Sequence, residues 1–482
     1  MLFTEPTFLF LFLPVLLGLY FLPGSRHRNG VLLAASVVFY ETGGGWFTAL
    51  MLASIAFNYR IAIAIDRRHG LPGARRLLAA AVGVNLAVLG VFKYANFFAD
   101  NVSTLGLVLG LHPIAVPRIL LPIGISFFTF HAISYVVDVF RRDAVAQKHP
   151  AHAALYLLLF PQLIAGPIIR YRDIADQLAA RPVRRDDLAQ GIRRFIVGLA
   201  KKALIANVVA VPADRIFAMP VAQLTAAHAW LGVLCYTLQI YFDFSGYSDM
   251  AIGLGRIFGF RFPENFRYPY VSRTIQEFWH RWHITLSTWF RDYIYIPLGG
   301  NRVAPWKVYR NLVVIFFLCG LWHGASWTFV VWGLYHGLFL VIERLGLARR
   351  LARAPRLAAH AYALLVVMVG WVFFRADTFT AAAGFLKAMA GFGAGAPTAY
   401  DATYYLNRET LLALAAGLAG SMPLVPALRG WLDRMPARTG TGGAAMEWSA
   451  GVLTTATLLV LFAASVLFVA AGTYNPFIYF RF

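Results

Sequence analysis

Two histidines stand in surroundings that favour chemistry. His283 lies in the segment RWHITLS, and His323 lies in CGLWHGASW within a long apolar run. A lone histidine in such a run can be a structural residue, but an ionisable residue inside a membrane segment also marks a functional path. Gly320 and Gly324 flank His323, and glycines let a backbone or a ligand come close. A neutral imidazole there could take a proton from a hydroxyl group and pass it to a leaving thiolate.

Two other arrangements of these residues suggest different chemistry. His280 and His283 are three residues apart and Glu277 is three residues further back, so the three could share a helix face as metal ligands. A straight helix would spread them along its axis, and no cysteine or second carboxylate lies nearby, so we predict no metal site. Cys319 lies one helical turn before His323, which leaves a Cys–His nucleophilic pair open.

The segment that holds His283 is aromatic and basic. Within residues 277–295, tryptophans alternate with Arg281 and Arg291. Trp favours the membrane interface, and Arg pairs with lipid headgroups or with carboxylates. We therefore expect these residues to form an amphipathic helix on the cytoplasmic surface of a membrane.

The composition of the whole chain is that of a membrane protein. Of its 482 residues, 59% are hydrophobic and only 13% are charged, with a mean hydropathy of +0.63. A soluble domain carries about 25% charged residues. The net charge of +21 comes mostly from short loops between apolar runs, so we assign it to membrane topology and anionic lipid rather than to nucleic acid. The two cysteines both lie in apolar segments, which argues against a disulfide framework.

Basic residues also predict the orientation of the chain. Residues 1–7 contain no Lys or Arg, whereas Arg26 and Arg28 follow the apolar run of residues 8–22. A signal peptide has the opposite order, so we expect an uncleaved first helix with its N-terminus outside. Loops at residues 66–76 and 141–149 are basic, whereas those at residues 41–45 and 96–117 have no Lys or Arg. This alternation places the basic loops in the cytoplasm.

The apolar runs predict an all-α polytopic membrane protein with about eleven crossings. Residues 31–40 and 46–65 are expected to cross separately, and residues 312–342 are long enough to bend back on themselves. Re-entrant segments are tolerated where protein or a water-filled cavity covers them. No linker divides the chain, so we expect residues 1–482 to form a single transmembrane domain.

Several motifs occur together in an order typical of one family. FWHRWHITLSTWFRDYIYIPLGGNR, GLWHGASWTFVVWGLYHG, AGPIIRY and the terminal FIYFRF resemble the alginate O-acetyltransferase branch of the membrane-bound O-acyltransferase (MBOAT) family. The resemblance covers nearly the whole chain, and PLGGNR is more similar to the polysaccharide-acetylating branch than to the teichoic-acid D-alanylating branch. It implies a ring of tilted helices, with re-entrant and interfacial helices, around a central funnel and tunnel.

The resemblance also implies roles and partners. His323 matches the catalytic histidine of the family, and His283 matches a second motif position where relatives carry His, Asn or Asp. The implied reaction passes an acetyl group from acetyl-CoA in the cytoplasm across a bacterial inner membrane, for O-acetylation of an exported polysaccharide such as alginate. The implied partner is a periplasmic or membrane-anchored hydrolase-like protein. The phosphates of the donor would be attracted by four nearby basic residues, which are Arg281, Arg291, Arg302 and Lys307.

Three other functions remain open from the sequence. A polytopic transporter would also explain an intramembrane histidine, but transporters often contain two similar halves with paired broken helices, and the sequence has no such symmetry. The chain could instead be a scaffold or acyl-channel component without catalysis of its own. It could also be a member of the same family that acts on peptidoglycan, lipid or protein.

Overall fold

The computed structural model describes residues 1–22, 27–112, 117–393, 397, 400–432, 434, 441–472 and 474. Within these ranges the chain is helical and contains no β-strand, in agreement with the predicted all-α class. The terminal FIYFRF motif lies outside the described residues.

The helices follow one another with short connections. Those of the first half are η1 (Phe8–Phe12), α1 (Leu13–Phe21), α2 (Arg28–Gly44), α3 (Phe47–Arg67), α4 (Pro72–Leu89), η3 (Gly90–Tyr94), α5 (Ala95–Val108), α6 (Ile125–Arg141), α7 (Pro150–Leu158), α8 (Phe160–Leu163), α9 (Tyr171–Ala179), α10 (Arg185–Ala200), η4 (Lys201–Ala206), α11 (Asn207–Phe217) and η5 (Val221–Gln223). Those of the second half are α12 (Ala226–Ile257), η6 (Pro269–Val271), α13 (Ile275–Arg281), α14 (Ile284–Phe290), η7 (Arg291–Tyr295), α15 (Pro305–His323), α16 (Trp327–Ile342), η8 (Glu343–Leu347), α17 (Ala348–Arg353), α18 (Arg356–Arg375), α19 (Phe379–Met389), η9 (Ala402–Tyr405), α20 (Arg408–Gly420), α21 (Leu424–Leu432) and α22 (Thr441–Ala470).

The described helices give the chain the character of a multi-pass membrane protein. Six of them are long and apolar enough to cross a membrane, because each offers at least 18 residues with few charges. They are Phe47–Arg67, Pro72–Val108, Arg185–Phe217, Trp327–Arg353, Arg356–Arg375 and Trp448–Ala470. Phe8–Phe21 and Phe379–Met389 are shorter apolar helices. The figure of about eleven crossings stays a prediction.

Two expected loops are largely helical. Residues 41–44 belong to the end of α2, and residues 95–108 form α5, which continues α4 and η3 without a break. The prediction of a loop at residues 96–117 was therefore wrong over most of its length. The physical reason is that this stretch lacks basic residues but is rich in apolar ones, such as Leu105, Leu107 and Val108, and such a pattern suits a helix as well as a loop. Residues 113–116 lie outside the described part of the chain.

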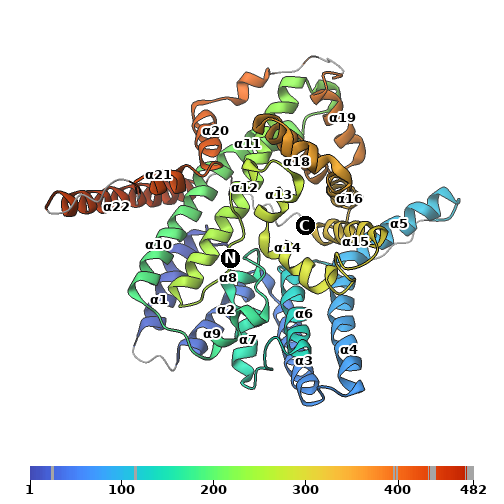
Figure 1. Ribbon diagram of the computed structural model, residues 1–482, viewed down its shortest axis with the longest axis vertical. Helices are drawn as coiled ribbons and strands as arrows, with labels where there is room; N and C mark the ends of the chain where they lie inside the picture. Colours follow the sequence, from blue (N-terminus) through green and yellow to red (C-terminus); the bar gives the residue numbers. More distant parts are fainter. Residues whose placement is uncertain are drawn as a thin grey trace.

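Helix α12 lies at the centre of the molecule. It is buried on every side along most of its 32 residues and packs against α10, α11 and α18. A helix that is apolar all round is expected in such a buried position. Figure 1 shows α10 and α12 side by side, with α15, α16 and α18 on the opposite side of α12 from α10. Helix α22 extends outwards as an arm that contacts α10 and η4.

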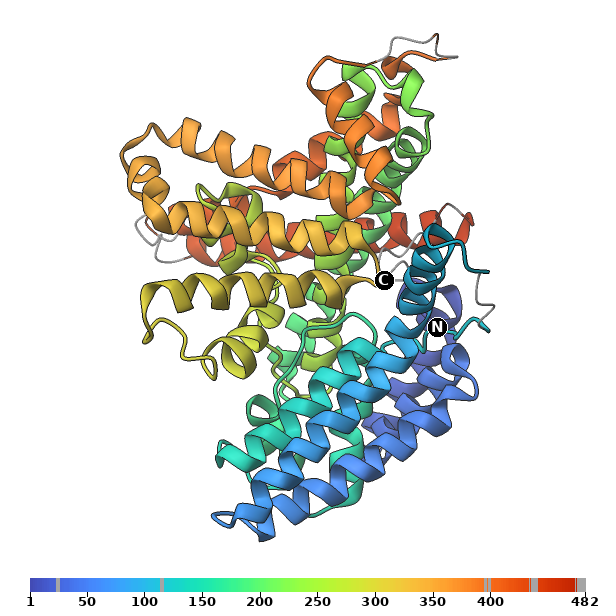
Figure 2. The ribbon, with the colours of Figure 1, turned by 90° about the vertical axis from the view of Figure 1, so that its right-hand side faces the viewer.

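Helices α15 and α16 form a hairpin, as the predicted bend in residues 312–342 required. The chain turns at residues 324–326, and Ser326 caps α16 by accepting a hydrogen bond from the Thr328 N–H. The two helices touch through glycines, since a Cβ added to Gly333 would lie 2.2 Å from the Phe316 carbonyl oxygen and 3.0 Å from the Gly320 Cα. Figure 2 shows α15, α16 and α18, coloured yellow to orange, stacked one on another, while the N-terminal helices gather at one end.

Residues 277–295 do not form the expected surface helix. They are divided between α13, α14 and η7, and His283 breaks the chain by adopting a left-handed backbone with φ of 42°. The indoles point inward: Trp282 packs on Trp371 at 4.9 Å and Trp279 on Trp332 at 5.8 Å between ring centroids. Hydropathy could not distinguish aromatic rings that face lipid headgroups from rings that fill a core, so the surface interpretation was wrong.

Candidate functional site

His323 is the last residue of α15 and is buried, with 4% of its surface exposed. Helix α15 ends there because the following residue, Gly324, adopts an extended backbone. The imidazole stands in an aromatic enclosure, with ring centroids 4.9 Å from Trp332 and 5.2 Å from Phe374. Such an enclosure excludes bulk water and keeps a basic imidazole away from competing proton donors.

His283 is fully buried, and its environment fixes its tautomer. Its Nδ1 lies 3.1 Å from the Asn265 side-chain oxygen. The same oxygen accepts hydrogen bonds from the Thr285 N–H and hydroxyl, at 3.3 Å and 2.9 Å, so it acts as an acceptor throughout. Nδ1 of His283 must therefore carry the proton, which leaves Nε2 with a free lone pair. Nε2 is buried and has no hydrogen-bond partner among the described residues.

The two histidines lie on either side of one indole. The Trp322 ring centroid is 6.1 Å from that of His283 and 4.9 Å from that of His323. They come from different elements, since His323 ends α15 and His283 precedes α14. The structure thus brings together the two histidines that the sequence singled out, although 39 residues lie between them in the chain.

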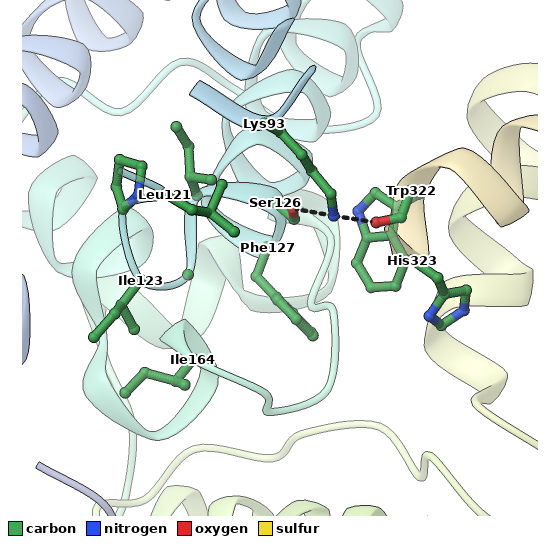
Figure 3. A pocket seen from close by; sticks show the side chains of 11 residues that line it. Lys93, Leu121, Ile123, Ser126, Phe127, Ile164, Trp322 and His323 are labelled. Atoms are coloured by element: carbon green, nitrogen blue, oxygen red, sulfur yellow. Dashed lines mark hydrogen bonds between the residues drawn. The ribbon is translucent and has the colours of Figure 1, made fainter. Parts of the chain in front are cut away.

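A small cavity of about 150 Å³ opens beside His323. Figure 3 shows the Lys93 ammonium in its wall, hydrogen-bonded to Ser126 and to the Trp322 carbonyl oxygen. The rest of the lining is mainly apolar and comes from the connection before α6, the start of α6, and Ile164. A hydroxyl-bearing group could enter this space beside the imidazole of His323.

A larger cavity of about 480 Å³ lies on another side of α15. Its lining combines apolar side chains with the polar or basic residues Gln276, His280, Arg291, Asn301 and Arg344. It shares no lining residue with the small cavity, but α15 bounds both. Cys319 lines the larger cavity and His323 the smaller one, so the two side chains face different spaces although they lie one helical turn apart.

The four basic residues expected to attract donor phosphates have different positions. Arg291 lines the larger cavity, whereas Arg281 binds Glu277 at 2.9 Å and donates to the Arg267 carbonyl oxygen. Arg302 and Lys307 do not line that cavity, and Lys307 lies over the Trp306 ring. Arg344, on η8, contributes a cation that the sequence did not single out, because it lies beyond the motif region.

The metal-binding alternative does not have the geometry it needs. His280 lies on α13, whereas His283 lies beyond the end of α13 with its Nδ1 turned to Asn265. Within the ranges that the structure describes, no three His, Cys, Asp or Glu residues are grouped so that they could hold a metal ion.

An ion-pair cluster joins the AGPIIRY motif to the RDYIYI motif. Asp292 binds Arg170, Arg172 at 2.6 Å and Arg291 at 2.7 Å, while Arg141 donates to its carbonyl oxygen. Burial would raise the pKa of Asp292, but the hydrogen bond from Arg291 and the charges of Arg170 and Arg172 outweigh it and hold the pKa below its ordinary value. The cluster anchors η7, which carries Arg291 at the wall of the larger cavity.

Sequence reasoning missed two residues that hold the histidines. Asn265, in the segment PENFRYPY, orients His283, and Lys93 contacts the residue before His323. Lys93 stood out only as a basic residue at the edge of a supposed loop. A buried amide cannot be recognised from the sequence of one loop, but a lysine within an apolar helix is a signal that could have been used.

Comparison with known proteins identifies the family. The profile of the MBOAT membrane-bound O-acyltransferase family matches residues 117–375, which include both histidines and both cavities' principal walls. The chain is 44% identical to the "probable alginate O-acetylase AlgI" of Pseudomonas putida and 45% identical to that of Azotobacter vinelandii, over 100% of each chain. It is 36% identical to the peptidoglycan O-acetyltransferase of Helicobacter pylori over 85% of this chain and 84% of the relative. With a helical fold rich in apolar spans and a buried histidine pair, the chain belongs to the membrane-bound O-acyltransferase family and is an acyltransferase.

Proposed function

We propose that this acyltransferase carries an acetyl group from cytoplasmic acetyl-CoA to the other side of the membrane, for O-acetylation of an exported polysaccharide such as alginate. The names of the full-length relatives support the acetyl group and the polysaccharide. Family membership favours an enzyme over the transporter and scaffold alternatives. The partner would be a periplasmic or membrane-anchored hydrolase-like protein that completes transfer to the polymer.

The observation that carries the proposal is the placement of His323 between two cavities. The larger cavity has an apolar wall and two arginines, Arg291 and Arg344, which suits a donor with an extended arm and an anionic head. The smaller cavity reaches His323 from another side and suits the hydroxyl group of an acceptor. A base at the junction of the two spaces can serve both substrates.

The reaction then follows from the neutral imidazole of His323. The acceptor hydroxyl attacks the thioester carbonyl carbon while His323 takes its proton, and a C–O bond forms. The C–S bond breaks next, and the imidazolium returns the proton to the departing thiolate. The products are the acetyl ester and free CoA thiol. His283, whose Nε2 keeps a free lone pair, supports this step from the second motif.

Substitution of His323 tests the mechanism. General-base assistance is worth about 10²–10⁴-fold, so His323→Ala should reduce acetylation by at least about 10²-fold at an unchanged membrane level. His283→Ala should also reduce it. The measurement is acetate released from the exported polymer by mild alkali, together with transfer from labelled acetyl-CoA by purified protein in liposomes.

Two results would contradict the proposal. Normal acetylation by a well-expressed His323→Ala variant would remove the base from the mechanism. Activity with acetyl phosphate or a lipid-linked acetyl donor, but not with acetyl-CoA, would show that the donor is wrong while leaving the role of His323 intact.

A further inference from the structure

Lys93 is a buried cation that the proposed reaction does not use. It lies in η3, a π-helical turn within the apolar helix of residues 72–108, and only 7% of its surface is exposed. An ammonium group in an apolar helix is costly unless it has partners. π-Helical turns inside longer helices often occur at functional sites.

The partners of Lys93 belong to the helix that carries His323. Its Nζ donates to the Trp322 carbonyl oxygen and, at 3.2 Å, to the Ser126 hydroxyl. The next residue, Tyr94, donates from its hydroxyl to the Leu321 carbonyl oxygen at 2.7 Å. Two consecutive residues of η3 therefore bind two consecutive carbonyl groups immediately before His323.

These contacts cap the C-terminal end of α15. The last four carbonyl groups of an α-helix have no partner within the helix and carry the negative end of its dipole. In α15 the Gly320 carbonyl oxygen accepts from the Gly324 N–H at 3.3 Å, while η3 supplies donors for the next two. A cation at that end is favourable, and its removal would free the backbone on which His323 is mounted.

We propose that Lys93, assisted by Tyr94, is a positioning residue for His323. It holds the end of α15 through the Trp322 carbonyl oxygen, and this fixes the direction in which the imidazole projects beside the small cavity. The inference rests on the proposed role of His323 as the base. It assigns to the N-terminal helix of residues 72–108, which lies before the family match at residues 117–375, a direct part in arranging the site.

The expected effect of Lys93→Met is a loss of kcat without a change in the KM for acetyl-CoA. A displacement of about 1 Å of a catalytic group can cost about 10²-fold in rate. Lys93 lines the small cavity and not the larger one, so donor binding should stay unchanged. Lys93→Arg, which keeps the charge and N–H donors, should restore part of the activity. Tyr94→Phe removes one hydrogen bond and should lower kcat a few-fold.

Lys202→Met is the matched control, because Lys202 is also buried but binds Asp243 at 2.8 Å in the contact between η4 and α12. Its loss should lower thermal stability while kcat per folded molecule stays at the wild-type value. The assay is labelled acetyl transfer in liposomes, normalised to folded protein by size-exclusion chromatography.

The outcomes separate this inference from the proposed function. If His323→Ala is inactive while Lys93→Met keeps the wild-type kcat, the positioning role is wrong and the proposed base stands. If Lys202→Met loses as much kcat as Lys93→Met, the effect is general destabilisation and the inference also fails. Should Lys93→Met not fold, wild-type kcat in both Lys93→Arg and Tyr94→Phe would overturn it. If His323→Ala is active, the proposed function itself fails.

Discussion

Replacement of Asn265 by leucine removes the acceptor that holds His283 at nearly constant side-chain size. The Asn265 oxygen accepts from His283 Nδ1 and from the N–H and hydroxyl of Thr285, while its amide donates to Ser248 at 3.0 Å. Three buried donors would lose their acceptor. Each such loss costs about 1 kcal/mol, so we expect Asn265→Leu to lower the free energy of unfolding by about 3 kcal/mol.

The same substitution should affect the reaction more than the fold. Without the Asn265 oxygen, nothing fixes the proton of His283 on Nδ1, and the ring can turn away from Trp322. We expect kcat to fall by about 10²-fold in the protein that remains folded. The assay is transfer from labelled acetyl-CoA at a temperature well below the unfolding midpoint, with activity divided by the amount of folded protein.

Asn85→Leu provides the comparison. Asn85 is also buried and exchanges hydrogen bonds with Asn58, at 2.8 Å and 3.1 Å, between α4 and α3. It should lower stability but leave kcat per folded molecule unchanged. Wild-type kcat in Asn265→Leu would refute the orienting role of Asn265, and an equal loss in both variants would show that the effect is not specific to His283.

Three further results are expected. Cys319→Ala should keep nearly full acetylation, because the thiol faces the larger cavity and not His323; a loss as deep as that of His323→Ala would favour a Cys–His mechanism. Gly333→Ala should reduce the yield of folded protein, since its Cβ would meet a backbone oxygen of α15 at 2.2 Å; a normal yield would show that α15 and α16 can separate without cost. In intact cells an externally added thiol reagent should label Asn101→Cys and not Gly70→Cys, and the reverse pattern would overturn the proposed orientation.

Much of the architecture could be predicted from the apolar runs. Their length and low charge indicated a helical membrane protein, the separate helices α2 and α3, and the hairpin of α15 and α16. The basic loops were less informative about helix ends. Charge records the side of a membrane on which a segment lies, but it does not show whether the segment is helical, and so residues 96–108 were misassigned.

The candidate site was predictable in its histidines but not in its supports. His283 and His323 stood out because ionisable residues in an apolar stretch are rare. Their partners did not, because Asn265 and Lys93 act through contacts that span 18 and 229 residues of the chain. Local sequence records a helical face or a turn, whereas such contacts exist only after the helices pack.

The position of His323 depends on three separate parts of the chain at once. Lys93 and Tyr94 fix the end of its helix, Trp332 on α16 packs against its ring, and Trp322 joins it to His283. Because α15 also separates the two cavities, any acyl transfer between them must occur at the end of this helix, where its backbone is held from outside rather than by its own turns. A histidine in the middle of a helix would be more rigid, but its side chain would face one space only. The helix terminus exposes the imidazole to a junction, and the lysine from a distant helix supplies the rigidity that the terminus lacks.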